Sequence, residues 1–417
     1  MRCFPEDGLP ERRRAGPPAA LLTESGCDVG HPGLDEDVIY LDYNATTPVD
    51  PRVAEAAWPY VSRFFGNPST SYAYAERPRR ALAEARREVA GLIGSRPEEI
   101  VFTGGGSESD VTAIRGLVPP GGHVVTQRTE HPAVLRTCES LARLHGVRVT
   151  LLPVDERGLV DPAELEAAVT ARTHLVSIMT ANGETGVLQP VAELAGIAHR
   201  HGALFHTDAA QAAGKIPLAV GDLGVDLLTV AGHKLYAPKG IGALYVREGV
   251  DVEPLLHGGG QEGGRRAGTE NTAYAVALGA AARIAAEETT REAARLSALR
   301  DLLHLRLHQR LPGRVLLNGH PGRRLPGTLN VSVAGVRGAD LLAVTPQVAA
   351  ATGSACHTGD PEPSAVLLAM GLDRDRALGA VRLSLGRWTT ERDVETAARL
   401  LADAAYRPGG PAAAVSP

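Results

Sequence analysis

Short apolar runs alternate with amphipathic segments along most of this chain, and this alternation restricts the fold more than any other feature of the sequence. Pro78–Ile93 has apolar or small residues at helical spacing with Arg and Glu between them, and Val191–His201 is a second predicted helix. Alternation of this kind predicts helices that cover a mainly parallel sheet. The strands predicted for this sheet are Ile100–Thr103, His123–Thr126, Val147–Leu152, His174–Thr180, Ala203–Thr207, Leu227–Ala231 and Gly242–Val246.

A second strand-bearing section follows the first. After about residue 285 the pattern predicts a long helix, which leads to the strands Leu329–Val333 and Val381–Leu385. The chain has 417 residues, and a single core stops growing at about 250–300 residues. We therefore predict a larger N-terminal α/β domain and a smaller C-terminal domain. Residues 1–37 lack sustained periodicity and residues 406–417 are rich in Pro, Gly and Ala, so we expect a disordered extension and a loose tail.

The composition excludes several classes of function. The formal net charge is −5, so the chain lacks the basic surplus of a protein that binds nucleic acid or an anionic membrane. No apolar stretch approaches the roughly 18 residues of a membrane span, and the first residues lack the apolar centre of a signal peptide. Cys3, Cys27, Cys138 and Cys356 have neither zinc-ligand nor disulfide-framework spacing. We therefore expect a cytoplasmic protein with no membrane partner and no direct nucleic-acid partner.

Only three lysines occur beside forty arginines, and all three lie within residues 215–239. An Arg-biased genome explains the scarcity but not the clustering. Lys234 follows the predicted strand Leu227–Ala231, and Asp208 follows the preceding predicted strand. A lysine at the mouth of a buried strand loses solvation, and its neutral amine can then form a Schiff base. Taken alone, however, the pair is better explained by an acidic cap and a surface lysine.

A glycine-rich turn supplies the third part of this pattern. Residues 102–109, Phe-Thr-Gly-Gly-Gly-Ser-Glu-Ser, follow a predicted strand and open a predicted helix. Backbone N–H groups and the Ser107 hydroxyl can bind a phosphate there. Taken alone, however, this segment is explained equally well by a turn that binds no ligand. It is no nucleotide-binding P-loop, because no Gly-Lys-Ser/Thr follows. Together with Lys234 and Asp208 it predicts pyridoxal 5'-phosphate, which needs an amine, a carboxylate facing its ring nitrogen and a phosphate-binding loop.

On these and further motifs the chain resembles a known family, the cysteine desulfurases, which are class V aminotransferase-like, fold type I pyridoxal phosphate enzymes. The resemblance runs from about Val38 to Ala405. It implies a large domain at residues 51–290 with a mainly parallel seven-stranded sheet, and a small α+β domain formed by residues 38–50 with 291–405. The motifs are YLDYNATTPVDPRV (40–53), GNPST (66–70), FTGGGSES (102–109), TEHPAVLRTC (129–138), ETGVLQPV (184–191), TDAAQAAGK (207–215), AGHKLYAPKGIGALYV (231–246), GGGQE (258–262), RRAGTEN (265–271), TGSAC (352–356) and VRLSLGRWTT (381–390).

The resemblance implies a role for each of several cofactor-binding residues. Lys234 would bind the aldehyde, Asp208 the ring nitrogen and Gln211 the phenolate oxygen. His131 would stack on the ring and help to move protons, and Thr269 would complete the phosphate site of the neighbouring subunit in a homodimer. Plainer alternatives are that His131 is a core histidine and Gln211 a helix-start residue. The remaining cofactor-binding positions are Gly106, Ser107, His233 and Asn182.

Two further residues are implied to act on the substrate. Cys356 lies in the small-residue segment ATGSACHTG, where a thiol can reach the sulfur of bound L-cysteine and carry a persulfide to an acceptor protein. The planar guanidinium of Arg382 would bind the substrate carboxylate. The implied products are L-alanine and the Cys356 persulfide, and the sequence does not name the acceptor. Cys138, on a predicted helix, is expected to pack as a small hydrophobe instead.

Three positions depart from the family's pattern. Gly183 stands where an asparagine beside the phenolate oxygen is usual, Ala231 where a phosphate-binding serine is frequent, and Asp110 where asparagine is common. Losing two polar contacts at about 1 kcal/mol each would weaken cofactor binding about thirtyfold. Two alternatives to a desulfurase therefore stay open. One is a related pyridoxal phosphate enzyme, such as a selenocysteine lyase or an aminotransferase-like enzyme, and the other is a degenerate scaffold that only binds a partner.

Overall fold

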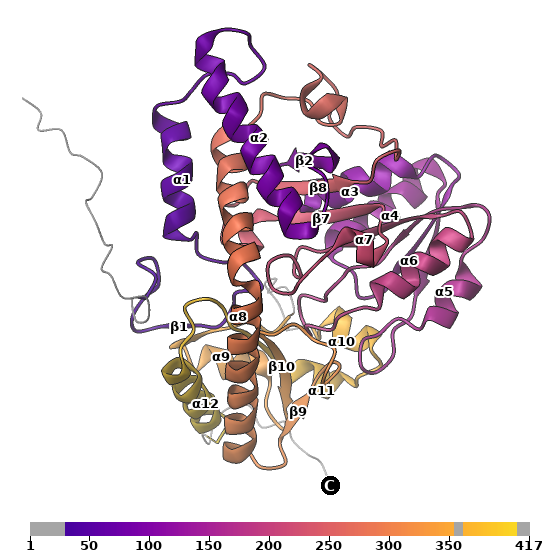
Figure 1. Ribbon diagram of the computed structural model, residues 1–417. Coiled ribbons are helices and arrows are strands. Elements are labelled where there is room, and N and C mark those ends of the chain that lie inside the picture. The colour runs from indigo at the N-terminus through magenta and orange to yellow at the C-terminus, as the bar shows by residue number, and fades with distance from the viewer. Residues whose placement is uncertain (1–29, 354–361, 407–417) are drawn as a thin grey trace, which may run out of the picture.

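The computed structural model describes residues 30–353 and 362–406. The strands of its larger sheet are β2 (Ile100–Thr103), β3 (His123–Gln127), β4 (Arg148–Leu152), β5 (Thr173–Ser177), β6 (Leu204–Asp208), β7 (Leu227–Ala231) and β8 (Gly242–Val246). They lie in the order β2-β8-β7-β6-β5-β3-β4 (Figure 1). β8 runs antiparallel to both of its neighbours, and all other pairings are parallel. The predicted mainly parallel, seven-stranded sheet is confirmed.

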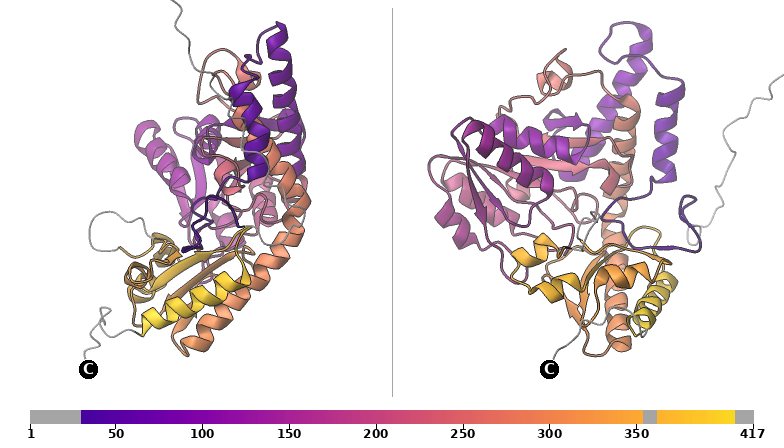
Figure 2. Two further views of the ribbon diagram at one scale, coloured as in Figure 1. Left: turned by 90° about the vertical axis from the view of Figure 1, so that its left-hand side faces the viewer. Right: turned by 180° about the vertical axis from the view of Figure 1, so that it is seen from behind.

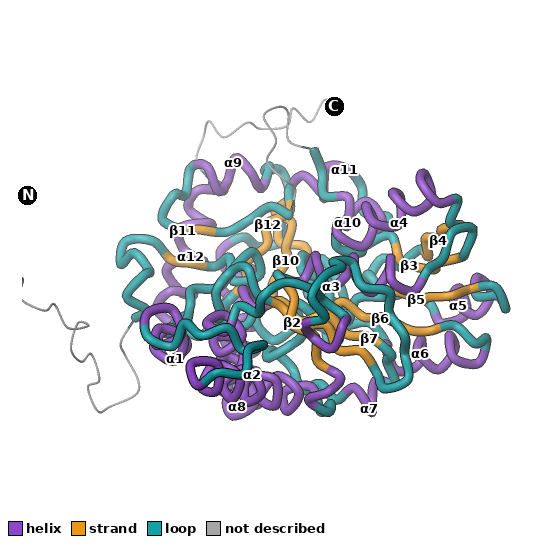
Figure 3. The backbone as a smooth tube through the Cα atoms, turned by 90° about the horizontal axis from the view of Figure 1, so that it is seen from above, coloured by secondary structure: helices purple, strands orange, loops and turns teal. Residues whose placement is uncertain are grey.

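Helices cover both faces of the large sheet, because successive side chains of a strand point to opposite faces. In β3, Val125 enters the core beneath α2 (Ala73–Ile93), α5 (Pro162–Ala168), α6 (Val191–Arg200) and α8 (Thr272–Arg310). Its neighbour Val124 enters the core beneath α3 (Gly106–Leu117) and α4 (Pro132–His145). Seen from above, α1 (Pro51–Ser62), α2 and α8 gather at one end, and α5 and α6 lie at the other (Figure 3).

Two helices begin earlier than the sequence predicts. α8 begins at Thr272, where the Asn271 side chain accepts a hydrogen bond from the Tyr274 N–H. Its first turns are alanine-rich and buried against α1 and α2, so they show no amphipathic pattern. α2 begins at Ala73 and not at the predicted start, Pro78, which lies inside the helix. α8 continues from the large sheet to the smaller one (Figure 2), and no helix in the described ranges is long and apolar enough to cross a membrane.

The smaller sheet has three antiparallel strands in the order β12-β10-β9. Val331 and Leu383 of this sheet pack with Leu307 of α8 and Leu401 of α12 in a separate core. Leu41 joins this core, next to β1, which pairs in parallel with β11. The α+β character of this part and the overall α/β fold class agree with the prediction. The elements not yet given are β1 (Ile39–Tyr40), β9 (Val315–Leu317), β10 (Thr328–Val333), β11 (Val348–Ala349), β12 (Ala380–Ser384), α7 (Val220–Leu223), α9 (Gly338–Ala343), α10 (Ala365–Ala369), α11 (Arg374–Leu378) and α12 (Glu391–Ala405).

The ends of the chain are described only in part. Most of the predicted extension at residues 1–37 and the tail after Tyr406 lie outside the described residues. Within residues 30–37, the His31 Nε2 donates to the Val49 carbonyl at 2.7 Å, so this short stretch packs against the start of the fold.

Candidate active site

The predicted cofactor-binding residues lie where strands of the large sheet end. Asp208 is the last residue of β6, Lys234 follows β7, and His131 follows β3. These strands are parallel, so their carboxyl ends meet at one edge of the sheet, where α/β proteins bind their ligands. The fold thereby brings together groups from three separate motifs of the sequence.

The backbone around Lys234 is tightly constrained. Lys234 ends a short 3-10 turn, Gly232–Lys234, that directly follows β7. A Cβ on Gly232 would lie 2.8 Å from the Ile241 carbonyl oxygen, so only glycine fits. Tyr236 has a φ of 62°, a conformation that is costly for a bulky residue and that clusters at functional sites. The packing around this turn therefore holds its backbone in a conformation that its residues would not otherwise prefer.

The Lys234 amine is held near the N-terminal segment of the fold. Its Nζ donates to the carbonyl oxygens of Asn44 and Ala45 at 2.5 and 2.7 Å. Burial, assisted by the positive charge of Arg382, lowers the pKa of Lys234 to about 8. A substantial fraction of the amine is thus neutral near physiological pH, as Schiff-base formation requires.

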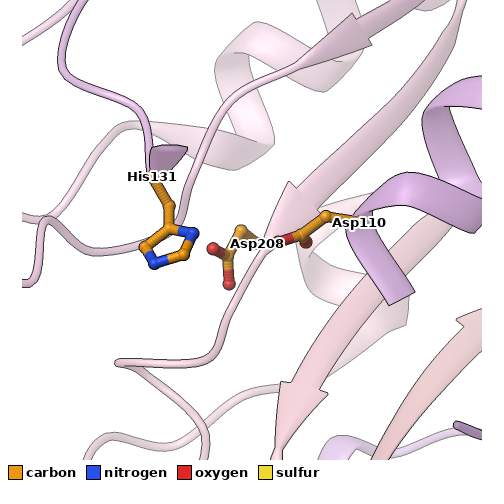
Figure 4. Close-up of side chains that lie close together, drawn as sticks. All are labelled: Asp110, His131 and Asp208. Atoms are coloured by element: carbon orange, nitrogen blue, oxygen red, sulfur yellow. The ribbon is translucent and has the colours of Figure 1, made fainter. Parts of the chain in front are cut away.

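Three side chains converge at this edge of the sheet (Figure 4). His131 caps the start of α4, Asp208 ends β6 and Asp110 lies in α3, and their ligand atoms are within 4.8 Å of one another. Burial raises the pKa of Asp208, and burial with the nearby Asp208 charge raises the pKa of Asp110 well above its usual range. Asp110 Oδ1 has no hydrogen-bond partner among the described residues. We infer that Asp110 stays protonated and that Asp208 carries the negative charge of the pair.

Gln211 lies just beyond Asp208, and its amide is held at both ends. Nε2 donates to the Asn44 carbonyl at 2.9 Å, and Oε1 accepts from Lys215 Nζ at 2.7 Å. A Cβ on Gly183 would lie 3.0 Å from Gln211 Nε2. The glycine at position 183 therefore leaves the space that the Gln211 side chain occupies.

The amide of Asn182 shapes the turn that carries Gly183. Its Oδ1 accepts from the backbone N–H groups of Glu184 and Thr185 at 2.9 and 2.8 Å, and its Nδ2 donates to the Thr129 carbonyl at 3.0 Å. The contact of Asn182 with a cofactor stays a prediction.

The glycine-rich turn begins α3, as predicted, and no side chain in the described ranges caps this helix. A Cβ on Gly106 would lie 3.1 Å from the Ala231 methyl carbon, and Ser107 is exposed. The negative charge of Glu108 at this turn is paired, since its Oε1 accepts from Arg266 Nε at 2.9 Å. Burial lowers the pKa of His233 to about 4, so this imidazole is neutral. Uncapped N–H groups at a helix start suit a phosphate.

Arg382 reaches this site from the smaller sheet. It lies in β12, and its Nη1 donates to the Gly183 carbonyl at 3.2 Å while its Nη2 pairs with Asp42 Oδ1 at 2.7 Å. Its buried Nε has no partner among the described residues. A guanidinium with an unused N–H in a polar site can bind a further carboxylate.

The two other predicted site residues are placed differently. Thr269 is exposed on the loop 258–271. That loop is anchored by Glu262, whose carboxylate oxygens accept from both Nη atoms of Arg86 at 2.7 Å. Cys356 lies outside the described residues. The described residue nearest before it, Gly353, lies beside Glu184, because a Cβ there would be 2.3 Å from Glu184 Cδ.

Sequence reasoning assigned no role to three residues that the structure places in this site. Asp42 and Asn44 fall in the motif YLDYNATTPVDPRV (40–53), but only their contacts with Arg382 and Lys234 show that they belong to the site. Lys215 ends the motif TDAAQAAGK (207–215) and belongs to the unexplained lysine cluster, and these were the available signals. The prediction for Cys138 is confirmed: it is 1% exposed, and burial raises its pKa to about 12.

Comparisons with known proteins agree with this geometry. The aminotransferase class-V family profile matches residues 39–396. A cysteine desulfurase of Mus musculus is 47% identical over 364 residues, which cover 86% of this chain and 79% of the mouse protein. A solved NifS-like protein superposes with a TM-score of 0.81 at 35% identity, over 88% of this chain and 98% of its own. A structure described as SspA in complex with cysteine has a TM-score of 0.73 at 36% identity, over 84% and 99% of the two chains. The chain therefore belongs to the class-V aminotransferase family and, within it, to the cysteine desulfurases, which are pyridoxal phosphate-dependent enzymes.

Proposed function

We propose that this chain converts L-cysteine into L-alanine and a persulfide on Cys356, and that it passes the sulfur to an acceptor protein. The observation that carries the proposal is the convergence of Lys234, Asp208 and His131 at one sheet edge, next to Arg382. A neutral amine, a buried carboxylate and a free guanidinium N–H are the groups that amino-acid chemistry on pyridoxal phosphate requires.

The residues present fit pyridoxal 5'-phosphate. The uncapped start of α3 with Gly106, Ser107 and His233 suits the phosphate, and the Asp208 carboxylate suits a protonated ring nitrogen. When bound, the cofactor supplies an electron sink for charge that develops at the substrate Cα. Lys234 Nζ would accept the Cα proton, and His131, exposed beside Asp208, would stack on the ring. Asn182 and Gln211 complete the cofactor-binding set.

Arg382 binds the substrate carboxylate in this proposal. Its Nη1 donates to the Gly183 carbonyl, in the turn next to the cofactor-binding residues, and its Nε has no partner within the described part of the chain. Asp42 already pairs with Nη2, so the incoming carboxylate shares the guanidinium with Asp42 or displaces it. The related SspA was solved in complex with cysteine, which supports L-cysteine as the ligand.

Cys356 receives the sulfur in this proposal. Gly353, three positions earlier in the chain, lies against Glu184 at the turn that Arg382 contacts. Attack of the Cys356 thiolate on the substrate sulfur breaks the bond from Cβ to sulfur, forms a bond between the two sulfurs, and leaves the carbon skeleton as L-alanine after protonation. Four scattered cysteines without a disulfide framework favour a cytoplasmic location.

We also propose a homodimer in which Thr269 completes the phosphate site of the neighbouring subunit. A patch of large apolar side chains near α1 and α2 supports it, and each of them is more than half exposed: Trp58, Val61, Phe65, Tyr72 and Tyr74. A monomer rarely exposes a patch of this kind. The Ser69 hydroxyl contacts Glu270, the neighbour of Thr269, at 3.4 Å, so the patch lies beside the loop that would cross to the partner.

The proposed function is tested by giving the purified chain pyridoxal phosphate and L-cysteine, and then adding a thiol reductant. We expect equal amounts of alanine and sulfide, and a mass increase of one sulfur on the Cys356 peptide before the reductant is added. Alanine without sulfide, or selenide release from selenocysteine in the absence of any reaction with cysteine, would contradict the proposal. Mixing wild type with a Thr269→Ala variant and measuring cofactor affinity of the mixed dimer tests the shared phosphate site.

A further inference from the structure

Lys215 has no place in the cofactor-binding set above, yet its amine lies one hydrogen bond from it. Nζ donates to Gln211 Oε1 at 2.7 Å and to Asn44 Oδ1 at 3.0 Å. We propose that Lys215 is a positioning residue that fixes the Gln211 amide with its NH₂ group toward the phenolate oxygen of the cofactor. This inference rests on the proposed function, which makes that oxygen the ligand of Gln211.

The hydrogen bonds define which way the Gln211 amide points. The Asn44 main-chain carbonyl can only accept, so the amide atom that faces it is Nε2, and Oε1 is the atom that faces Lys215. Nε2 has two hydrogens and uses one on Asn44, which leaves the other for a ligand. A rotated amide would lose both bonds and present an oxygen to the phenolate, where two acceptors repel each other.

Asn44 extends this arrangement to the cofactor lysine. Its side chain is fully used, because Oδ1 accepts from Lys215 while Nδ2 donates to the Gly183 carbonyl and to Thr328 Oγ1 at 3.1 and 2.9 Å. Its main-chain carbonyl accepts from both Gln211 and Lys234. Asn44 is 3% exposed, so this junction is held by packing as well as by hydrogen bonds. Lys215 therefore fixes the group on which both Gln211 and Lys234 rest.

Gly183 makes the site depend more strongly on the orientation of the Gln211 amide. Residue 183 has no side chain to offer the phenolate oxygen, and Gln211 occupies the space beside it, with Nε2 at 3.0 Å from the position of a Cβ. The amide of Asn182, in the same turn, already donates from Nδ2 to the Thr129 carbonyl and to the Met179 sulfur at 3.0 and 3.7 Å. Gln211 is thus the amide of these two that has an N–H left for that oxygen. A site that relies on one amide depends strongly on the orientation of that amide.

The charged groups around Lys215 come from several elements. Burial lowers the pKa of Lys215, and the positive charges of Lys234 and Arg382, which belong to the site, lower it further. On the other side, Lys215 lines a cavity of about 40 Å³ with Glu288, Glu292 and Arg387. Because a change at Lys215 alters charge as well as hydrogen bonding, the experiment has to separate the two effects.

The first test compares Lys215→Met with Lys239→Met, since Lys239 is an exposed lysine outside the site. Two properties are measured on the chain loaded with pyridoxal phosphate: the dissociation constant of the cofactor and the pH midpoint of its visible absorption band. We expect Lys215→Met to raise the dissociation constant about tenfold. We also expect a higher pH midpoint, because a phenolate oxygen without its donor holds a proton more tightly. Lys239→Met is expected to leave both values unchanged.

A double-mutant cycle then separates positioning from charge. If Lys215 acts through Gln211, Lys215→Met adds little to the shift already produced by Gln211→Met. A fully additive shift, or an unchanged midpoint in Lys215→Met, overturns the inference. Lys215→Arg keeps a donor and is expected to lie nearer to wild type than Lys215→Met. Should Lys215→Met fail to fold, Lys215→Gln, which is too short to reach Gln211, replaces it with the same expected shift.

Failure of the proposed function and failure of the Lys215 role give different spectra. If the wild-type chain takes up pyridoxal phosphate without a visible band that depends on Lys234, the proposed function fails. If the wild-type band depends on Lys234 but titrates identically in Lys215→Met, only the role of Lys215 fails.

Discussion

The two sheets contribute to the site in different ways. The large sheet supplies Lys234, Asp208 and His131 from the ends of strands that are buried on both faces. The small sheet supplies Arg382 from within β12, and the guanidinium of Arg382 contacts the rest of the site through single hydrogen bonds to Gly183 and Asp42. The cofactor side is therefore fixed by the backbone, whereas the substrate side is attached through a few polar contacts. Cofactor binding and substrate handling should accordingly be separable by mutation.

The largest effect is expected for Lys234→Ala on the cofactor side. Without the amine, the Cα proton has no acceptor at this position, and alanine formation is expected to fall at least about a thousandfold. The visible absorption band of the bound cofactor is expected to be lost or shifted. A variant that retains both the band and the activity would show that another group holds the cofactor.

Arg382→Lys tests the substrate side. Lysine cannot bind a carboxylate with two parallel N–H groups, and the loss of one charge-assisted bond, about 1.5–3 kcal/mol, corresponds to about a tenfold to hundredfold higher KM for L-cysteine. The dissociation constant of the cofactor is expected to stay unchanged. Arg399→Lys, at an exposed position of α12, is the matched control. A tenfold loss of cofactor affinity in Arg382→Lys would contradict the separation of the two sides.

The pH dependence of cofactor capture sharpens the account of Lys234. The neutral amine is the reactive form, and burial lowers the pKa of Lys234 to about 8. The rate of cofactor uptake by the empty chain should therefore rise about tenfold between about pH 7 and pH 9 and then level off. An ordinary lysine, with a pKa of about 10.4, would show a rate that is still rising steeply at pH 9. Stopped-flow absorbance over this pH range distinguishes the two cases.

The smallest effect is expected at Gly183. A methyl group there crowds Gln211 Nε2, so Gly183→Ala should weaken cofactor binding by a few fold. Gly183→Asn crowds it in the same way but adds a polar group beside the phenolate oxygen, worth about 1 kcal/mol. We therefore expect Gly183→Asn to bind the cofactor more tightly than Gly183→Ala. Because asparagine is usual at this position in the family, we also expect Gly183→Asn to bind the cofactor more tightly than wild type. Equal dissociation constants for the two variants would remove position 183 from the cofactor contacts.

The sequence predicts the large sheet well because its strands are short, apolar and bounded by turns. β2, β7 and β8 have the predicted bounds, and Asp208 and Lys234 follow from their places at strand ends. The predicted start of α8 was wrong because the first turns of this helix are alanine-rich and buried. Amphipathic periodicity indicates only helices that have a solvent-exposed face. The roles of Asp42, Asn44 and Lys215 could not be predicted, since they depend on contacts between distant segments.

The separation of the two sides is tested most directly by adding L-cysteine to the Cys356→Ala variant loaded with pyridoxal phosphate, and recording the visible spectrum and alanine release together. The account predicts that cysteine still perturbs the cofactor spectrum, with an affinity close to that of wild type, while alanine release falls at least about a thousandfold. Alanine released as fast as by wild type would contradict the assignment of Cys356. A spectrum that no longer responds to cysteine would contradict the separation of cofactor binding from sulfur transfer.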